Sequence, residues 1–379
     1  MNVFFKYCVG SCAVFLALNS CVEPYQPAVE KSSQHVLVVD GFINTTTSSA
    51  SVHLTRTKPI ADKTFTSEQK AKVLVEEESG NSYPLAEVSP GQYEAKALPV
   101  VSSKRYRLKV TTTDAKEFAS AFVRLQQVPA IDSVSWTPSP EGLSVNVSTH
   151  DPTNNTQYYL WKTEETWRYR AAYRSEFKFK GTTVVNRTSS ELIYDCWRSA
   201  NSSKILIATT SHLGEDRVSE FQLVFIPKNS RKILLRYSIL VKQFALDKDA
   251  FEYWRQLQKT TENLGGLFDP LPGQTQGNIS CTSSPEEPVL GYFSGGSVSE
   301  KRMYIDLYDL PKYLFGSTLR PDCKADSVPI NQLSVINGSF NLVAPIYRGL
   351  EIIGFTAATF ECSDCRLEGG TLTKPVFWE

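Results

Sequence analysis

The sequence predicts a mainly β protein, in which an immunoglobulin-like or transthyretin-like β-sandwich precedes a larger β-rich domain with one prominent α-helix. Two observations carry the β prediction: apolar and polar residues alternate over many short segments, and turn-forming residues separate these segments. A third observation concerns residues near 247–264, where apolar residues recur with helical spacing.

Residues 1–20 have the pattern of a signal peptide. The apolar segment 7–18 is too short to cross a bilayer, which takes about 20 residues. Leu18, Ser20 and Cys21 then match the −3, −1 and +1 positions of a bacterial lipobox. We therefore expect lipidation of Cys21 with acyl groups such as palmitate, because two or more chains hold a protein firmly at a membrane. The alternative is an ordinary secretory signal with a chance cysteine nearby.

Length and composition limit the remaining possibilities. Without the first 20 residues, 359 of 379 are left, which suggests about two domains. Residues 21–35 are polar and contain two prolines, so we expect a flexible tether. Lys plus Arg and Asp plus Glu both number 40, so no basic excess is available to neutralise phosphates. We expect no nucleic-acid partner.

The predicted sandwich spans 36–127. In 105–111, Tyr106, Leu108 and Val110 alternate with polar residues, as in a strand with one buried and one solvated face. Similar short segments, separated by turn residues, are expected to form strands at 36–43, 50–56, 71–77, 82–88, 91–98, 105–111 and 117–125. Such a module is typical of a spacer or an interaction platform, and its fold alone says nothing of chemistry.

The second predicted domain spans 128–379. Its segment 158–180 is dense in aromatic residues and arginines and is expected to form long, twisted hairpin strands. Residues 308–350 lack a clear period. Other strands are expected at 143–147, 204–210, 220–227, 232–242, 288–294, 301–307 and 351–360.

The one clear helix is expected near 247–264. Asp247 is a suitable N-cap, and Asp249 places negative charge in the first turn. Gly265 and Gly266 would end the helix. Its apolar residues recur at i, i+4 and i+7: Ala250, Trp254 and Leu257. We expect this face, including Trp254, to pack on a sheet.

Five cysteines remain once the signal peptide and the lipid site are set aside: Cys196, Cys281, Cys323, Cys362 and Cys365. An exported chain meets an oxidising compartment, so disulfides are expected, and 15 pairings with one thiol left over are open. We favour Cys196–Cys281, with Cys323 joined to Cys362 or Cys365. In Cys362-x-x-Cys365 no helix start follows and no second ligand pair exists, so a structural disulfide that pins the C-terminal tail is favoured over a redox or zinc motif.

Catalytic motifs are missing from the sequence. The four histidines are scattered, and there is no HExxH, GxSxG, GxGxxG, P-loop or EF-hand pattern. We therefore expect no catalytic residues, no metal site and no cofactor.

Four aromatic residues lie close together in the chain: Trp161, Trp167, Tyr169 and Tyr173. If exposed, they could stack on a sugar ring or contact a partner, so they are candidate interface residues. If buried, they fill a sandwich core, which is the interpretation favoured for the group.

Several segments together resemble a Bacteroidota lipoprotein family known as domain of unknown function 4249. They are CVEPY (21–25), VLVVDGFI (36–43), the helix and loop at 250–272, GNISC (277–281), VLGYFSGGSVSEKR (289–302) and the cysteine-containing C-terminus (362–378). The resemblance implies an outer-membrane lipoprotein, often encoded beside a TonB-dependent transporter. It supplies no catalytic residues.

These observations predict a non-enzymatic lipoprotein, anchored in the outer membrane on its periplasmic or extracellular face. We expect it to be an accessory or solute-capture partner of a TonB-dependent transporter, and its solute to be an oligosaccharide, a peptide or another small molecule. One alternative is a structural or adhesive envelope protein. Another is an unrecognised hydrolase, which requires a deep polar pocket with a perturbed carboxylate.

Overall fold

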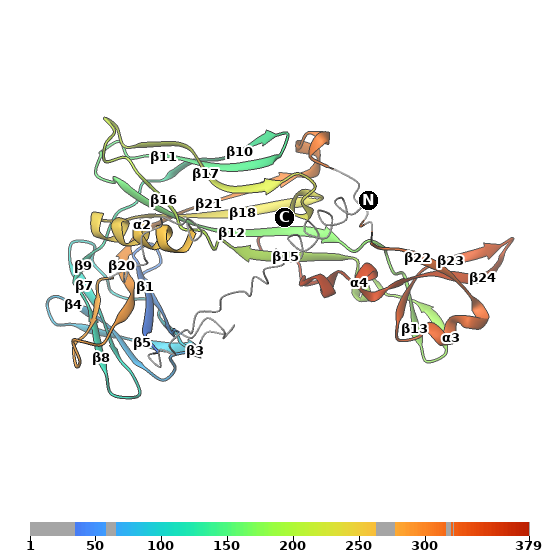
Figure 1. Ribbon diagram of the computed structural model, residues 1–379, viewed down its shortest axis with the longest axis horizontal. Helices are drawn as coiled ribbons and strands as arrows, with labels where there is room; N and C mark the ends of the chain where they lie inside the picture. The colour runs from blue at the N-terminus through green and yellow to red at the C-terminus, as the bar shows by residue number, and fades with distance from the viewer. Residues whose placement is uncertain (1–34, 58–65, 263–276, 316–319, 321, 379) are drawn as a thin grey trace, which may run out of the picture.

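The computed structural model describes residues 35–57, 66–262, 277–315, 320 and 322–378. The predicted signal peptide, the lipobox with Cys21 and nearly all of the predicted tether lie outside these residues. The prediction of a mainly β protein is confirmed, with strands arranged in four sheets. The molecule has three parts: a sandwich that lies beside one end of a central pair of sheets, and a distal sheet beyond the other end (Figure 1).

The sandwich contains the strands that sequence alternation predicts and one short strand, β3, that it does not. They are β1 (Leu37–Asn44), β2 (Ser49–Arg56), β3 (Thr66–Ser67), β4 (Lys72–Glu77), β5 (Ser82–Ser89), β6 (Gln92–Ala95), β7 (Arg105–Thr111), β8 (Glu117–Ser120) and β9 (Val123–Arg124). Alternate residues of these strands form one apolar core, in which Leu37, Val39 and Tyr106 are completely buried.

Two strands from much later in the chain complete the sandwich. β19 (Ile279–Cys281) pairs with β8, and β20 (Val289–Gly296) pairs in parallel with β1. The sandwich is therefore not confined to the predicted span 36–127. The sequence did not reveal this, because a parallel neighbour reaches its partner only through a long crossover and leaves no local turn signal.

The central part consists of two packed sheets. One has the order β10-β11-β17, and the other has the order β15-β12-β18-β21 with β16 paired to β12. The bounds are β10 (Ile131–Ser139), β11 (Gly142–His150), β12 (Tyr158–Arg170), β15 (Asp195–Asn201), β16 (Leu206–Thr209), β17 (Arg217–Pro227), β18 (Arg236–Ala245) and β21 (Val298–Asp306). On β18, Tyr237, Ile239 and Val241 share one face and are fully buried. Ile233 and Leu235 precede the strand.

The predicted hairpin at 158–180 is wrong. β12 is a single strand of 13 residues whose neighbours are β18, β15 and β16. The end of the segment belongs to β13 (Phe177–Lys180) in a different sheet. An aromatic-rich alternating run shows that a strand exists, but it does not reveal which strand lies beside it.

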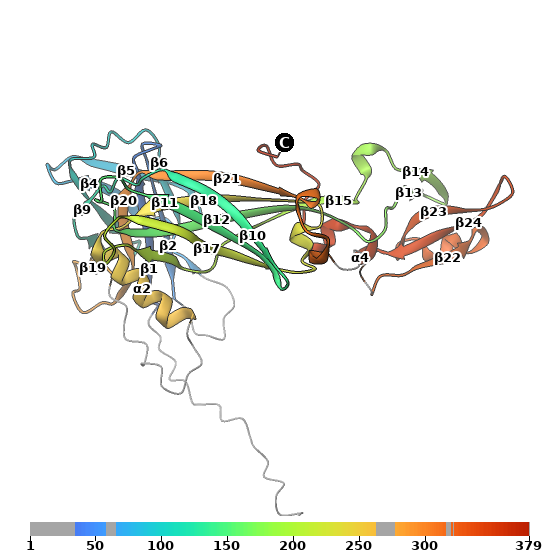
Figure 2. The same ribbon diagram turned by 90° about the horizontal axis from the view of Figure 1, so that it is seen from above.

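Helix α2 (Lys248–Glu262) confirms the predicted helix. The Asp247 carboxylate accepts a hydrogen bond from the backbone N–H of Ala250 at 2.8 Å, as an N-cap does. Ala250 and Phe251 are buried against Leu160 and Tyr292, so the apolar face packs on the end of the central sheet. In both views α2 lies beside the place where the sandwich meets the central strands (Figure 2). The predicted glycine stop lies outside the described residues.

The distal sheet has the order β14-β13-β23-β24-β22. Its elements are β13 (Phe177–Lys180), β14 (Thr183–Asn186), β22 (Ala325–Pro329), α3 (Leu333–Ile336), β23 (Phe340–Arg348), β24 (Glu351–Thr359) and α4 (Phe360–Ser363). Sequence analysis missed β22 and β23, because neither strand has a clean buried face. Short 3-10 helices occur at 189–191, 231–233, 307–309, 312–314, 330–332 and 365–368. None of the helices in the described ranges is long and apolar enough to span a membrane.

Candidate functional site

A cleft of about 220 Å³ opens where the sandwich meets the central sheet and α2. We call it the junction cleft. Its sandwich wall comes from the outer faces of three paired strands, because alternate residues such as Val39 and Ile43 point into the sandwich core. This wall consists of Asp40, Phe42 and Asn44 of β1, Ser49 and Ser51 of β2, and Tyr292 and Ser294 of β20.

The opposite wall is the outer face of the central sheet. Near the sandwich, two rows of residues cross this face, and within each row the residues are paired across the neighbouring strands β12, β18 and β21. The apolar row is Leu160, Phe244 and Val298, and the charged row is Lys162, Lys242 and Glu300. Trp254 of α2 closes one end. The two walls therefore bring together residues that are far apart in the chain.

Aromatic rings form the base of the junction cleft. Phe42 and Phe244 meet edge to face with ring centroids 5.2 Å apart. Tyr292 is buried and lies 5.1 Å, centroid to centroid, from Tyr253 of α2. Burial, followed by the nearby Asp40 carboxylate, raises the pKa of Tyr253 to about 12, so this phenol stays protonated at neutral pH.

Charged side chains form the rim. Lys162 Nζ lies 3.7 Å from Asp40 Oδ2 and links the central sheet to the sandwich. Lys242 Nζ lies 4.0 Å from Glu300 Oε1 and also pairs with Glu164. Lys162 thus faces Asp40, whereas Lys242 lies between Glu164, its closer partner, and Glu300. The rim therefore offers hydrogen-bond donors and acceptors, and each of its charged groups lies near a group of opposite charge.

The chemistry of the junction cleft suits binding. Aromatic surface with a few polar groups at an interface between modules is the usual make-up of a small-ligand site. The lining serines have no hydrogen bond to a histidine or carboxylate among the described residues. Acyl transfer requires such a nucleophile–base pair. In the described part of the chain, no three histidine, cysteine or acidic side chains form a group that could hold a metal ion.

A second cleft, of about 550 Å³, lies at the other end of the same sheet face, and we call it the C-terminal cleft. Its arginines are already engaged. Arg168 and Arg170 both lie 3.0 Å from Asp195, and Arg236 lies 3.4 Å from Asp306. The chain's own tail lines the cleft with Lys374 and Trp378. We therefore assign this larger cleft a structural role and take the junction cleft as the candidate functional site.

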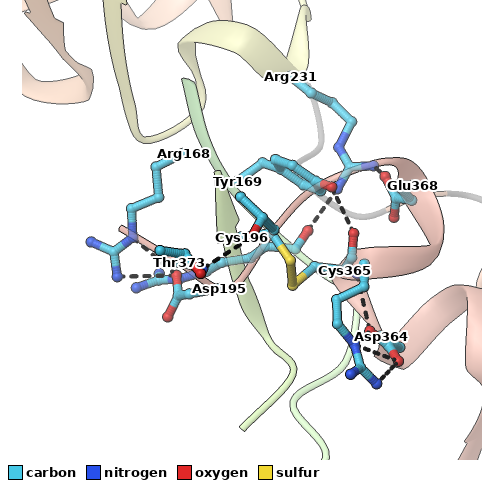
Figure 3. Close-up of a disulfide and its surroundings, with 12 residues drawn as sticks. Arg168, Tyr169, Asp195, Cys196, Arg231, Asp364, Cys365, Glu368 and Thr373 are labelled. Atoms are coloured by element: carbon cyan, nitrogen blue, oxygen red, sulfur yellow. Dashed lines mark hydrogen bonds and ion pairs between the residues drawn. A yellow bond between two sulfur atoms is a disulfide. The ribbon is translucent and has the colours of Figure 1, made fainter. Parts of the chain in front are cut away.

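The C-terminal tail is held by a disulfide between Cys196 of β15 and Cys365. Figure 3 shows Arg168 and Asp195 beside this bond. Tyr169 Oη donates a hydrogen bond to the carbonyl oxygen of Cys365 at 2.6 Å. Further along, Trp197 and Thr371 exchange backbone hydrogen bonds of 2.9 Å. The tail is thus tied to the edge of the central sheet at several points.

The structure corrects one predicted disulfide and confirms the other. Cys196 pairs with Cys365 and not with Cys281, whereas Cys323 pairs with Cys362. Cys281 is a buried free thiol. It lies on β19 inside the sandwich, while Cys196 belongs to the central core, so the two cannot meet. Both cysteines of the Cys362-x-x-Cys365 segment form structural disulfides, as predicted. Their partners differ, because Cys362 pairs with Cys323 and Cys365 pairs with Cys196.

Three of the four candidate interface aromatics belong to the core. Trp161, Trp167 and Tyr169 are buried between the two central sheets. Tyr173 is half-buried, and its hydroxyl donates to the carbonyl oxygen of Cys323 at 3.3 Å. The favoured interpretation, that these aromatic residues fill a core, is confirmed for these three, and their candidate role at an interface is wrong, because alternate residues of β12 point inward.

The aromatic residues that do line the cleft, Phe42 and Phe244, were not predicted as site residues. In each strand, however, the position of the aromatic residue among outward-facing residues could have indicated it. Phe42 occupies the same outward-facing series as Asp40 and Asn44, and Phe244 the same series as Lys242. A large aromatic ring on an otherwise polar strand face marks a surface that contacts something.

The family model of a domain of unknown function, DUF4249, matches residues 22–302. The chain belongs to the DUF4249 family. The matched span includes every residue that lines the junction cleft, whereas it ends before Asp306, Lys374 and Trp378 of the C-terminal cleft. No match was found among curated proteins. Of the two clefts in this DUF4249 chain, the junction cleft is thus the one that lies wholly within the family region.

Proposed function

We propose that this chain is a lipid-anchored accessory protein of the bacterial outer membrane. In this role it captures a small solute in the junction cleft and presents it to a TonB-dependent transporter. The observation that carries the proposal is the cleft itself, which joins an aromatic base to a rim of paired charged groups between two modules.

Two further features support an envelope location. Two disulfides tie distant parts of the chain, and such bonds persist in oxidising compartments. The N-terminal pattern that ends at Cys21 supplies the expected lipid site. A lipid at this position would anchor the chain through residues 22–34, ahead of the first strand of the sandwich.

The chemistry of the cleft favours capture over catalysis. Among the described residues, no base is hydrogen-bonded to the lining serines, as a hydrolytic nucleophile requires. The two carboxylates of the lining, Asp40 and Glu300, each face a lysine across the rim.

Fractionation of cells tests the anchor. The wild-type protein should sediment with outer membranes, and Cys21→Ser should be released in soluble form because the acylated thiol is lost. Lys228→Met, which alters an exposed lysine of the folded body, serves as the control and should stay in the membrane fraction. Equal membrane association of wild type and Cys21→Ser would remove the anchor from the proposal.

Affinity purification in mild detergent tests the partner. The tagged wild-type protein should recover a TonB-dependent barrel that mass spectrometry identifies. Deletion of the gene should slow uptake of that transporter's solute. Repeated purifications without any such barrel would contradict the accessory role.

One observation favours a second candidate function, that of a structural or adhesive envelope protein. The distal sheet extends away from the sandwich (Figure 1). Val335 of α3 and Leu350, in the turn between β23 and β24, are large apolar residues exposed in this part of the molecule. Exposed apolar surface can serve contacts between proteins. On this alternative, deletion of the gene would weaken surface attachment while solute uptake remains normal.

A further inference from the structure

We infer that the junction cleft binds a neutral, polyhydroxylated ring, that is, one residue of a sugar. This inference rests on the proposed function, since it names the class of solute that the capture site takes. The base, the rim and the size of the cleft each contribute to it.

The base of the cleft suits the C–H face of a sugar ring. Phe42 and Phe244 are half-buried in the protein alone, so ring surface remains available to a ligand. Trp254 adds a third partly exposed aromatic side chain at the end of the cleft. The C–H groups of a pyranose carry partial positive charge, and aromatic faces are negative, so the two surfaces attract each other as they pack.

The rim discriminates between ligands by charge. An anionic ligand would approach Asp40 and Glu300, and a cationic ligand would approach Lys162 and Lys242. Because each of these groups already lies near a group of opposite charge, neither an anionic nor a cationic ligand finds an unpaired counter-charge on the rim. The closest approaches within the two pairs are 3.7 Å and 4.0 Å, so each group keeps hydrogen-bonding capacity for hydroxyls.

The sandwich wall adds short hydroxyl groups. Ser51 and Ser294 lie directly opposite Phe42 on the two neighbouring strands, so they flank the aromatic base on both sides. A hydroxyl can donate and accept at once, and it can therefore pair with a sugar hydroxyl in either orientation. An aromatic surface between flanking hydroxyls matches a ring that is apolar on its face and polar around its edge.

The size of the cleft limits the ligand. Its 220 Å³ is below the roughly 300–1,000 Å³ of sites for drug-sized molecules. One ring therefore fits, and a longer chain must continue outside. The side chains of Asp40 and Lys162 are 60% and 52% exposed, so the rim is open to solvent on the side where further residues would extend.

Calorimetric titration of the purified protein with maltose, cellobiose, lactose and mannobiose tests the inference. At least one of these neutral disaccharides should bind at millimolar or lower concentration. Ser51→Trp, which fills the cleft from an exposed position, should abolish binding, and Lys162→Met should weaken it by about tenfold. Lys228→Met lies elsewhere and should bind as the wild type does, and thermal unfolding of each variant should confirm that it is folded.

Each outcome of the titration either supports the inferred ligand class or overturns it. Absence of binding by all four disaccharides, or binding that survives in folded Ser51→Trp, overturns the inference. The same holds if glucuronate, glucosamine or the dipeptide Gly-Phe binds at least tenfold more tightly than every neutral sugar. The titration needs no transporter, so a negative titration would contradict the ligand class without contradicting the accessory role. A negative affinity purification would contradict the accessory role without contradicting the ligand class.

Discussion

The rings of Phe42 and Phe244 meet edge to face with centroids 5.2 Å apart, and this contact joins the sandwich to the central sheet. Phe42 belongs to β1, and Phe244 belongs to β18. The same two rings form the base of the junction cleft. The candidate ligand site and the interface between modules therefore share their central residues, so a bound ligand would also stabilise the interface.

A double-mutant cycle measures that contact. Phe42→Ala and Phe244→Ala should show a coupling energy of about 0.5–1.5 kcal/mol in urea unfolding, as aromatic pairs do. Phe42→Ala combined with Phe355→Ala, a residue of the distal sheet, is the control and should be additive within about 0.5 kcal/mol. Additivity of the first pair would show that the two rings do not couple the modules.

Gln243 is a fully buried amide that links both central sheets. It accepts a hydrogen bond from Trp161 Nε1 at 2.9 Å and donates to Pro129 O and Thr149 Oγ1, both at 3.0 Å. Gln243→Leu leaves these groups without their partner and should lower the free energy of unfolding by at least about 2 kcal/mol. The control is Gln222→Leu on an exposed position, which should change it by less than about 0.5 kcal/mol. Equal stability of the two variants would contradict this role.

The disulfide pairing predicts a specific thiol count. Protein that starts after Cys21, and so also lacks Cys8 and Cys12, should react with no thiol reagent when folded, because Cys281 is buried, and with one equivalent when unfolded without reductant. Peptide mapping should recover the Cys196–Cys365 and Cys323–Cys362 links. A mapped Cys196–Cys281 link would contradict the structure.

Removal of the disulfide that closes the longer loop should lower the free energy of unfolding. The Cys196–Cys365 bond closes a loop with a sequence separation of 169 residues, so its loss restores much entropy to the unfolded chain. The variant with both cysteines changed to alanine should lose about 2–5 kcal/mol in the free energy of unfolding. Cys281→Ala is the matched control with no disulfide to lose, and it should lose clearly less. A similar loss in both variants would assign the effect to packing.

Asp151 should make stability depend on acid pH. Burial alone would raise the pKa of this carboxyl, but hydrogen bonds from Thr153 and Thr156 outweigh burial and lower it to about 2 from an ordinary 3.8. The lowered pKa contributes stability that is complete above pH 3.8 and is lost as pH falls towards 2. At pH 7, Asp151→Asn should therefore cost about 2 kcal/mol.

The test for Asp151 is urea unfolding of both proteins at several pH values. The difference between wild type and Asp151→Asn should be constant from pH 7 to pH 5 and should shrink below pH 4, because the carboxyl becomes protonated in the unfolded chain first. A difference that does not change with pH would show that the charge of Asp151 contributes nothing.

Gly291 allows β20 to lie against β1. Its φ is +118°, and a Cβ atom there would stand 1.8 Å from the carbonyl oxygen of Val39. Gly291→Ala should therefore separate the two strands and cost more than about 2 kcal/mol, with faster proteolysis of the sandwich. Gly214→Ala, where the added atom meets nothing within 4 Å, is the control and should change stability by less than about 0.5 kcal/mol. Wild-type stability in Gly291→Ala would contradict the close approach.

Sequence alone determined most strands and the helix, because burial of one face imposes a local period. Alternation in 105–111 predicted β7, and Asp247 with the apolar spacing after it predicted α2. The same period placed Trp161 and Tyr169 in a β12 strand, although it could not decide whether they faced the core or a partner. The family resemblance also came from the sequence and agrees with the matched region.

Only the tertiary structure decided which segments meet. The pairing of β20 with β1, the partner of Cys196 and the meeting of Phe42 with Phe244 all join residues that are distant in the chain. Such contacts depend on how whole sheets pack, and many arrangements satisfy the same local periods. For this reason the strands could be predicted one by one, while the cleft between them could not.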